Sequence, residues 1–148
     1  MTKSEARDVL DRSEEAGLVH MSQNVQNMTE DISEGWNFIC NCDRWHCLCI
    51  IDALAKPKPG LFFNSGFEPH FDQDLCVACE TCIDRCPPEA LTMGEDDVPE
   101  VDFDRCFGCA VCATGCTSKA IAMVNKPGFP EPPKDGNALI EAITASLA

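Results

Sequence analysis

LCVACETCIDRCPPEALTM, residues 75–93, contains four cysteines, and a similar stretch follows thirty residues later as RCFGCAVCATGCTSKAIAM, residues 105–123. When the two copies are aligned, the four cysteines, one alanine and one methionine coincide, and the apolar positions Leu91 and Ile121 match in type. The acidic stretch GEDDVPE, residues 94–100, separates them. Self-similarity at a fixed period is typical of two copies of one structural unit that pack together.

The cysteines of the first copy follow the pattern C-x2-C-x2-C-x3-C-P, and the second copy repeats it with Thr117 in place of Pro87. This spacing resembles the run by which bacterial ferredoxins hold [4Fe–4S] clusters. The three closely spaced cysteines can wrap one face of a cluster, while the fourth points away and closes the cluster of the other copy. The pattern predicts cluster I on Cys76, Cys79, Cys82 and Cys116, and cluster II on Cys86, Cys106, Cys109 and Cys112. Two zinc ribbons would instead need paired C-x2-C knuckles.

The overall composition favours metal over disulfides for the twelve cysteines of this 148-residue chain. The first residues, MTKSEARDVL, are polar and lack the apolar core of a secretory signal. No run approaches the roughly eighteen apolar residues of a membrane-spanning helix. We therefore expect a cytoplasmic protein with reduced thiols and no direct membrane insertion.

The formal net charge of −14 limits the partners of the chain. Such a surface repels nucleic acid and anionic membranes, and it favours a protein partner with a basic docking patch. The alternative is that the acidity only keeps the protein soluble.

A further cysteine group lies in ICNCDRWHCLC, residues 39–49. Three hypotheses compete for Cys40, Cys42, Cys47 and Cys49: a third [4Fe–4S] cluster, a zinc site, or redox-active thiols. The ligand number and the neighbouring ferredoxin pattern favour a cluster. The absence of C-x2-C spacing argues against it, and His46 could replace a cysteine in a zinc site. We expect His46 to be a hydrogen-bonding neighbour of the cluster instead of a ligand.

The chain divides into three predicted regions around these motifs, and we expect an α+β fold. Residues 1–60 form an N-terminal, cysteine-rich extension, residues 61–126 a ferredoxin-like domain with two [4Fe–4S] clusters, and residues 127–148 a Pro-rich arm with a terminal helix. Helices are predicted over residues 4–16, with a capping box from Thr2 and Glu5 and Gly17 as the stop, over 47–55 and over 137–147. KPKPG, residues 56–60, is the predicted internal boundary. Residues 61–72 are predicted to be extended, and Val101–Phe103 to be a strand.

The run GLVHMSQN followed by FICNC, upstream of a ferredoxin repeat, resembles ferredoxin-like redox proteins of strict anaerobes. The length, the three cysteine groups and the C-terminal tail look most like the small iron–sulfur subunit of class II benzoyl-CoA reductase, although residues 40–49 depart from the denser cysteine run of those relatives. The resemblance implies a large tungsten–pterin subunit, related to aldehyde ferredoxin oxidoreductases, in a hetero-oligomer such as a heterotetramer, with further electron-donor proteins. In that family the complex reduces the ring of benzoyl-CoA to a cyclohexadiene thioester.

The sequence contains no recognisable nucleophile–base pair or phosphate-binding glycine loop, and His20, His46 and His70 are scattered. We therefore expect a non-catalytic electron-transfer subunit that feeds electrons to the tungsten subunit. The alternatives are a free dicluster ferredoxin, the electron-transfer subunit of another aldehyde ferredoxin oxidoreductase-like enzyme, and a ferredoxin with a zinc-stabilised interaction module in residues 1–55.

Overall fold

The computed structural model describes residues 1–24, 37–131, 134, 137–138, 141 and 144–145. Within these ranges, short helices combine with two-stranded antiparallel sheets, which is the α+β class expected from the sequence. Much of the predicted C-terminal helix over residues 137–147, and the end of the Pro-rich arm, lie outside the described residues. No helix in the described part of the chain is long and apolar enough to cross a membrane.

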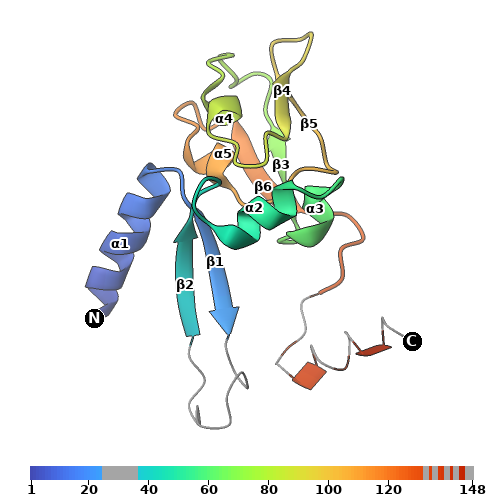
Figure 1. Cartoon of the computed structure of the whole chain (residues 1–148). Helices are drawn as coiled ribbons and strands as arrows, with labels where there is room; N and C mark the ends of the chain where they lie inside the picture. The colour runs from blue at the N-terminus through green and yellow to red at the C-terminus, as the bar shows by residue number, and fades with distance from the viewer. Residues whose placement is uncertain (25–36, 132–133, 135–136, 139–140, 142–143, 146–148) are drawn as a thin grey trace.

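The two cysteine-rich copies form an interlocked unit in which each sheet takes one strand from each copy (Figure 1). Strand β3 pairs with β6 and strand β4 pairs with β5, both antiparallel. With the strand that precedes its cysteines included, each copy has one short helix between two strands. The elements are β3 (Phe67–Phe71), α4 (Thr81–Asp84), β4 (Leu91–Met93), β5 (Pro99–Val101), α5 (Val111–Thr114) and β6 (Ile121–Asn125). The internal repeat in sequence is therefore a repeat in structure.

Equivalent backbone hydrogen bonds join the copies. The N–H of Asp72 donates to the carbonyl of Ala120, and the N–H of Asp102 donates to the carbonyl of Ala90, each over 2.8 Å. The predicted strand over residues 101–103 ends at Val101. It ends there because Asp102 begins a turn, in which its carboxylate accepts the N–H of Asp104 over 2.9 Å.

Four cysteines make up half of the buried core between the copies. The core residues are Cys82, Cys86, Ala90, Leu91, Cys112, Cys116, Ala120 and Ile121. Cysteine is a small residue that packs like an apolar one. A core composed so largely of thiols leaves little aliphatic material to stabilise the unit, so whatever the thiols bind becomes part of the core.

The N-terminal part begins with helix α1 (Lys3–Glu15), which confirms the helix predicted over residues 4–16. Both hydrogen bonds of the capping box are present, since the N–H of Glu5 donates to Thr2 and the N–H of Thr2 donates to Glu5. Gly17 ends the helix with a φ of +78°, a conformation that glycine adopts without strain. Arg85 then donates to the carbonyls of Glu14 (2.8 Å) and Glu15 (3.1 Å), so α1 is tied to the first copy.

A β-hairpin follows, formed by β1 (Val19–Asn24) and β2 (Asn37–Cys42). The sequence showed no clear period over residues 18–38, so this hairpin was not predicted. Helix α2 (Leu48–Leu54) confirms the helix predicted over residues 47–55. Helix α3 (Pro59–Phe62) occupies the start of the segment predicted to be extended, because Pro59 stands in its first turn, where a proline is tolerated.

The N-terminal part and the second copy share one apolar core, which is composed of Val19, Ile50, Ala53, Phe107 and Val111. The segment around residues 56–60, predicted to be a boundary, packs against the second copy. The Nζ of Lys58 lies 2.8 Å from the Oδ2 of Asp104, and the N–H of Gly60 donates to the Asp104 carbonyl over 2.8 Å. A Cβ at Gly60 would lie 2.7 Å from the carbonyl oxygen of Cys106, so this close approach requires glycine.

Candidate metal centres

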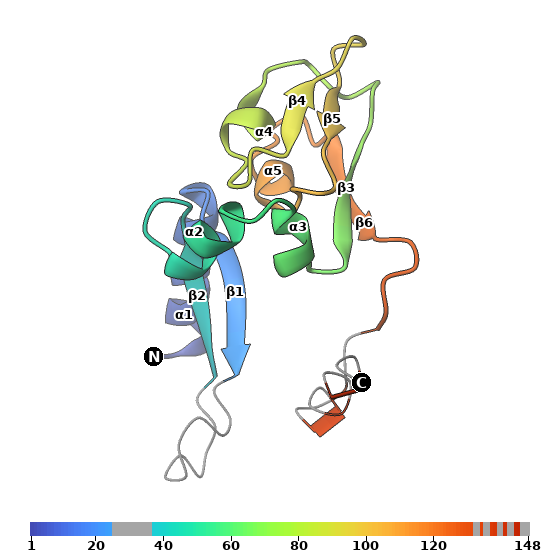
Figure 2. The same cartoon turned by 45° about the vertical axis from the view of Figure 1, so that its right-hand side comes forward.

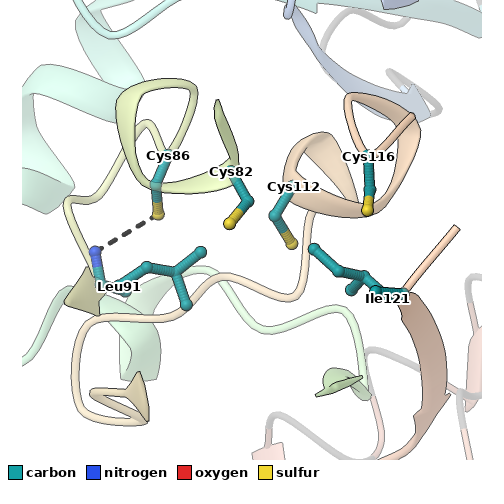
Figure 3. Packing of buried hydrophobic residues seen from close by; sticks show 8 residues of the cluster. Cys82, Cys86, Leu91, Cys112, Cys116 and Ile121 are labelled. Carbon is teal, nitrogen blue, oxygen red and sulfur yellow. Dashed lines mark hydrogen bonds between the residues drawn. The ribbon is translucent and has the colours of Figure 1, made fainter. Parts of the chain in front are cut away.

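Two cavities in the interlocked unit are lined by the two predicted ligand sets. The first is lined by Cys76, Cys79, Cys82 and Cys116, and the second by Cys86, Cys106, Cys109 and Cys112. Each cavity thus combines three cysteines of one copy with the fourth cysteine of the other. Figure 3 shows the four buried cysteines, Cys82 and Cys112 on α4 and α5 and Cys86 and Cys116 just after these helices, with their sulfur atoms facing the side of Leu91 and Ile121. The structure brings the predicted sets together, while ligation itself stays a prediction.

Apolar side chains complete both cavities. Met93 and Ile121 line the first, and Leu91, Phe107 and Met123 line the second. In the described part of the chain, no three His, Cys, Asp or Glu side chains meet closely enough to share a single metal ion. A [4Fe–4S] core binds each of four thiolates at a different iron, so its ligands surround a cavity instead of meeting at one point.

The loops around the cavities contain residues with positive φ at equivalent places in the two copies. The pairs, each separated by thirty residues, are Ala78 (+50°) and Gly108 (+69°), Glu80 (+59°) and Ala110 (+66°), and Glu89 (+50°) and Lys119 (+60°). For a residue other than glycine this conformation costs roughly 1–2 kcal/mol. Strain of this kind persists where the surrounding structure imposes it, and it is typical of sites that hold a ligand.

The strained residues direct backbone N–H groups at the thiols. Glu89 precedes Ala90, whose N–H donates to the Sγ of Cys86 over 3.3 Å (Figure 3, dashed line). Lys119 likewise precedes Ala120, whose N–H bonds to Cys116. In iron–sulfur proteins, hydrogen bonds to the sulfurs are among the features that set the potential of the cluster. The backbone strain therefore has a chemical use.

Hydrogen bonds favour the thiolate form at two of these cysteines. The hydroxyl and the N–H of Thr81 lower the pKa of Cys79. Burial raises the pKa of Cys116, but the hydroxyl of Ser118 and nearby N–H groups outweigh it, so that this pKa is lowered overall. Since iron binds the thiolate, these contacts suit a metal ligand.

At the second cavity the pKa values of two cysteines are raised instead of lowered, and this also fits a [4Fe–4S] cluster as the occupant. Burial raises the pKa of Cys109 to about 11, and it raises that of Cys112 to about 12, with smaller contributions from the charges of neighbouring thiolates. Four thiolates in so apolar a cavity need a positive charge between them. An iron core supplies that charge, so the residues present fit a [4Fe–4S] cluster.

The cysteines of the third group also lie together. Cys40 and Cys42 are two residues apart on β2, Cys47 is the cap of α2, and Cys49 lies in its first turn. The neighbouring thiols of Cys47 and Cys40 help to raise the pKa of Cys42, and those of Cys42 and Cys49 help to lower the pKa of Cys47. The four thiols therefore form one continuous group.

The pKa values of this group diverge. Burial raises the pKa of Cys42 to about 12, and the hydrogen bond and charge of Cys47 add to the effect. Burial also opposes ionisation of Cys47, but the N–H groups of Ile50 and Cys49 and the thiols beside it lower its pKa overall. The N–H groups of the first turn of α2 thus favour a thiolate at Cys47, as the loop N–H groups do at Cys79 and Cys116.

One turn recurs at all three cysteine groups, and sequence analysis missed it. In each, an aspartate stands four residues before a cysteine: Asp43 before Cys47, Asp72 before Cys76, and Asp102 before Cys106. The N–H of the cysteine donates to the aspartate carbonyl over 3.3, 3.0 and 2.9 Å respectively. The D-x3-C spacing was readable in the sequence and would have related residues 43–47 to the two copies.

The aspartate side chains close these turns in the same way. The Oδ1 of Asp43 accepts the N–H groups of Trp45 (2.6 Å) and His46 (2.8 Å). The Oδ1 of Asp72 accepts the N–H groups of the second and third residues after it, over 3.0 and 3.3 Å. The Nδ1 of His46 also lies 2.8 Å from Asp43, and its side chain is 85% exposed. Its role beside a cluster stays a prediction.

Comparison with known proteins agrees with this geometry. Residues 75–120 match the family model of the 4Fe-4S dicluster domain. The chain contains a ferredoxin-like dicluster domain. The match covers the first copy and all but the last three residues of the second. It supports an electron-transfer role for the dicluster domain, and it does not extend to the Cys40–Cys49 group. No curated protein matches the chain.

Gly108 offers a test of how the dicluster domain is built. A Cβ at this position would overlap the carbonyl of Phe67 and the hydroxyl of Ser65. We expect Gly108→Ala to lower the Tm of the iron-loaded protein by roughly 5–10 °C, equivalent to about 2–3 kcal/mol. Iron per chain should fall as well, since the loop lines the second cavity.

The matched control is Ala78→Gly in the first copy. There the new glycine relieves backbone strain in the folded protein but raises the conformational entropy of the unfolded chain. The change in the free energy of unfolding should therefore stay under about 1 kcal/mol. A Gly108→Ala protein with unchanged Tm and full iron would show that the loop is not held by residues 65–67.

Proposed function

We propose that this chain is a non-catalytic electron-transfer subunit that relays low-potential electrons through three [4Fe–4S] clusters to a catalytic partner. The observation that carries the proposal is the pair of cysteine-lined cavities, each shared between the two copies. When bound, the clusters supply one-electron redox chemistry. The chain's own residues provide the thiolates, direct N–H groups at them and exclude water.

The proposed ligands of cluster I are Cys76, Cys79, Cys82 and Cys116, and those of cluster II are Cys86, Cys106, Cys109 and Cys112. For the third site, with Cys40, Cys42, Cys47 and Cys49, we favour a cluster over zinc or redox-active thiols. The recurrence of the aspartate turn supports this choice, because the turn that leads to Cys47 is the same as the turns that lead to Cys76 and Cys106 in the dicluster domain. The N–H groups around Cys47 support it further.

The proposed order of the relay is third cluster, cluster II, cluster I. Cys42 and Cys47 pack against the apolar core shared with the second copy, and Cys109 packs against the same core. Cys86 and Cys116 lie together in the core between the copies, so clusters II and I would be neighbours. The third site is thus joined to cluster II, and cluster I would lie beyond.

Magnetic coupling in the fully reduced protein tests this order. We expect strong coupling between clusters I and II, and coupling of the third cluster to cluster II only. In Cys79→Ser, which removes a ligand of cluster I, the coupling of the third cluster should remain. In Cys109→Ser it should disappear. Equal coupling among all three would require a compact triangle, and the linear order would have to be abandoned.

The proposed partner is the large tungsten–pterin subunit of a benzoyl-CoA reductase of class II, in a cytoplasmic hetero-oligomer, with a heterotetramer as the expected form. The length, the three cysteine groups and the C-terminal tail, which look most like the small subunit of that family, support it. The partner would reduce the ring of benzoyl-CoA to a cyclohexadiene thioester, while this chain delivers electrons. A free dicluster ferredoxin or a subunit of another aldehyde ferredoxin oxidoreductase-like enzyme is the alternative.

Purification of the native protein under anaerobic conditions tests the partner. We expect this chain to copurify with a tungsten-containing chain, in a complex that oxidises a low-potential dye only when benzoyl-CoA is added. Copurification with tungsten but response to aldehydes alone would favour the alternative enzyme. Isolation of the chain alone, without tungsten, would contradict the subunit assignment.

A further inference from the structure

The two copies of the dicluster domain differ in what covers them. In the second copy, the residue after the first cysteine is Phe107, which is only 4% exposed. Its equivalent in the first copy is Val77, which is 66% exposed. Cys79 is exposed too, whereas its equivalent Cys109 is half-buried. One face of the repeat is therefore buried at cluster II and open at cluster I.

The cover on the second copy is provided by the chain's own N-terminal part: Val19, Ile50 and Ala53 pack in one core with Phe107, and the segment from Lys58 to Ser65 adds polar contacts. Ser65 accounts for two of its contacts, since its N–H donates to the carbonyl of Phe107 over 3.1 Å and its hydroxyl to that of Gly108 over 2.8 Å. The Nζ of Lys58 pairs with Asp104 over 2.8 Å. The second copy thus shows how this face is recognised: a cation binds the aspartate of the turn, and apolar groups cover the residue after the cysteine.

In the first copy, the residues equivalent to Asp104 and Phe107 are exposed. Asp74 is the equivalent of Asp104, thirty residues earlier. Within the part of the chain that the structure describes, no lysine, arginine or histidine pairs with the Asp74 carboxylate. Val77 takes the place of Phe107. Glu80, which is exposed, adds a charge where the second copy has Ala110.

The sequence that forms this face is rich in acidic residues. Between residues 59 and 104 it has twelve acidic residues and a single lysine or arginine, Arg85, which bonds to the end of α1, while Lys119 of the second copy is an exposed cation that flanks the cluster I cavity. The acidic turn at residues 95–97 reaches the cluster I ligands, since the Sγ of Cys76 lies 3.8 Å from the carbonyl oxygen of Asp97. Figures 1 and 2 place the β4–β5 hairpin, which carries this turn, at the opposite end of the molecule from β1 and β2.

We propose that Asp74, Val77, Glu80 and the turn at residues 95–97 form a docking face for a one-electron donor protein that presents lysine or arginine side chains around an apolar centre. The inference rests on the proposed relay, in which cluster I stands at one end, and it assigns that end to the electron donor. The donor is oxidised by one electron as this chain is reduced by one. Complementary charge steers encounter and speeds association, which suits a carrier that binds and leaves, and a second copy of this chain would bring the same negative charge.

The test uses cytochrome c, a lysine-rich one-electron protein, as the cationic probe. Each ferric cytochrome takes one electron from the reduced, iron-loaded chain, so docking is measured in the reverse direction. We expect the double variant Asp74→Asn with Glu80→Gln to react roughly three- to tenfold more slowly at low salt, with a weaker dependence on ionic strength. The matched control is Asp8→Asn with Asp11→Asn on the exposed side of α1, which changes the net charge equally and should react as the unaltered protein does.

Carbodiimide cross-linking to the same probe gives a second readout that is independent of rate. Linked peptides should contain Asp74, Glu80 or residues 95–97. Equal slowing of both double variants, no slowing of either, or links to α1 in comparable yield would overturn the docking face. Links from Lys134 of the same chain would also overturn it, since they would show that the face is covered internally.

Ferricyanide, an anionic acceptor, separates this inference from the relay itself. The Asp74 and Glu80 variant should react with ferricyanide at least as fast as the unaltered protein, because two repelling charges are gone. If the protein passes electrons to ferricyanide but the double variant reduces cytochrome c at the rate of the unaltered protein, the docking face is wrong and the relay stands. If it passes electrons to neither acceptor, the relay is wrong.

Discussion

Replacing Cys86 by serine should remove the cluster associated with the second copy, although Cys86 belongs to the first. In the structure Cys86 lines the cavity of Cys106, Cys109 and Cys112, and its thiol is buried there. Serine is a poor ligand for iron compared with thiolate. We expect the iron content to fall by about four atoms per chain.

Comparison of matched variants shows to which cluster Cys86 belongs. Cys86→Ser should leave the same residual electron paramagnetic resonance spectrum as Cys109→Ser, which alters the same cavity from the other copy. It should differ from the spectrum of Cys79→Ser, which alters the cavity of the first copy. If Cys86→Ser instead matched Cys79→Ser, each copy would hold its own cluster and the crossed arrangement would be wrong.

Replacing Cys47 and Cys49 together should remove the third cluster and leave the dicluster domain intact. These two thiols stand at the start of α2, and Cys47 is the member of the group whose thiolate is favoured by N–H groups. We expect a loss of about four iron atoms per chain, with the coupled signal of clusters I and II unchanged.

The control for this variant is Ser13→Ala in α1, where the hydroxyl of Ser13 donates to the carbonyl of Val9 over 2.7 Å. It should retain the full iron content. If the cysteine double variant lost zinc and no iron, the third site would be a zinc site. Loss of all iron would mean that the dicluster domain cannot fold without the third group. That result would contradict the prediction that clusters I and II are retained.

The parts of the structure that the sequence predicted are those fixed by short-range chemistry. The capping box of Thr2 and Glu5 specifies the start of α1 within a few residues. The cysteine spacing likewise predicted the two sets that line the cavities. In both cases the deciding residues lie close together or repeat at a fixed offset.

The parts that were missed depend on contacts between distant residues. Strands β1 and β2 pair across residues 25–36, and the apolar residues that alternate in them, such as Val19 with Met21 and Cys40 with Cys42, are too few to reveal a strand. The packing of Gly60 on the carbonyl of Cys106 is visible only in three dimensions. The contrast between Val77 and Phe107 arises from the same packing, so sequence comparison of the two copies gave no sign of it.

Metal and sulfide analysis of the anaerobically purified protein tests the central claim, three clusters in one chain, most directly. Three groups of four cysteines predict about twelve iron and twelve acid-labile sulfide per chain, with no stoichiometric zinc. A value near eight iron and eight sulfide with one zinc would contradict the claim, and it would make residues 40–49 a zinc site attached to a two-cluster ferredoxin.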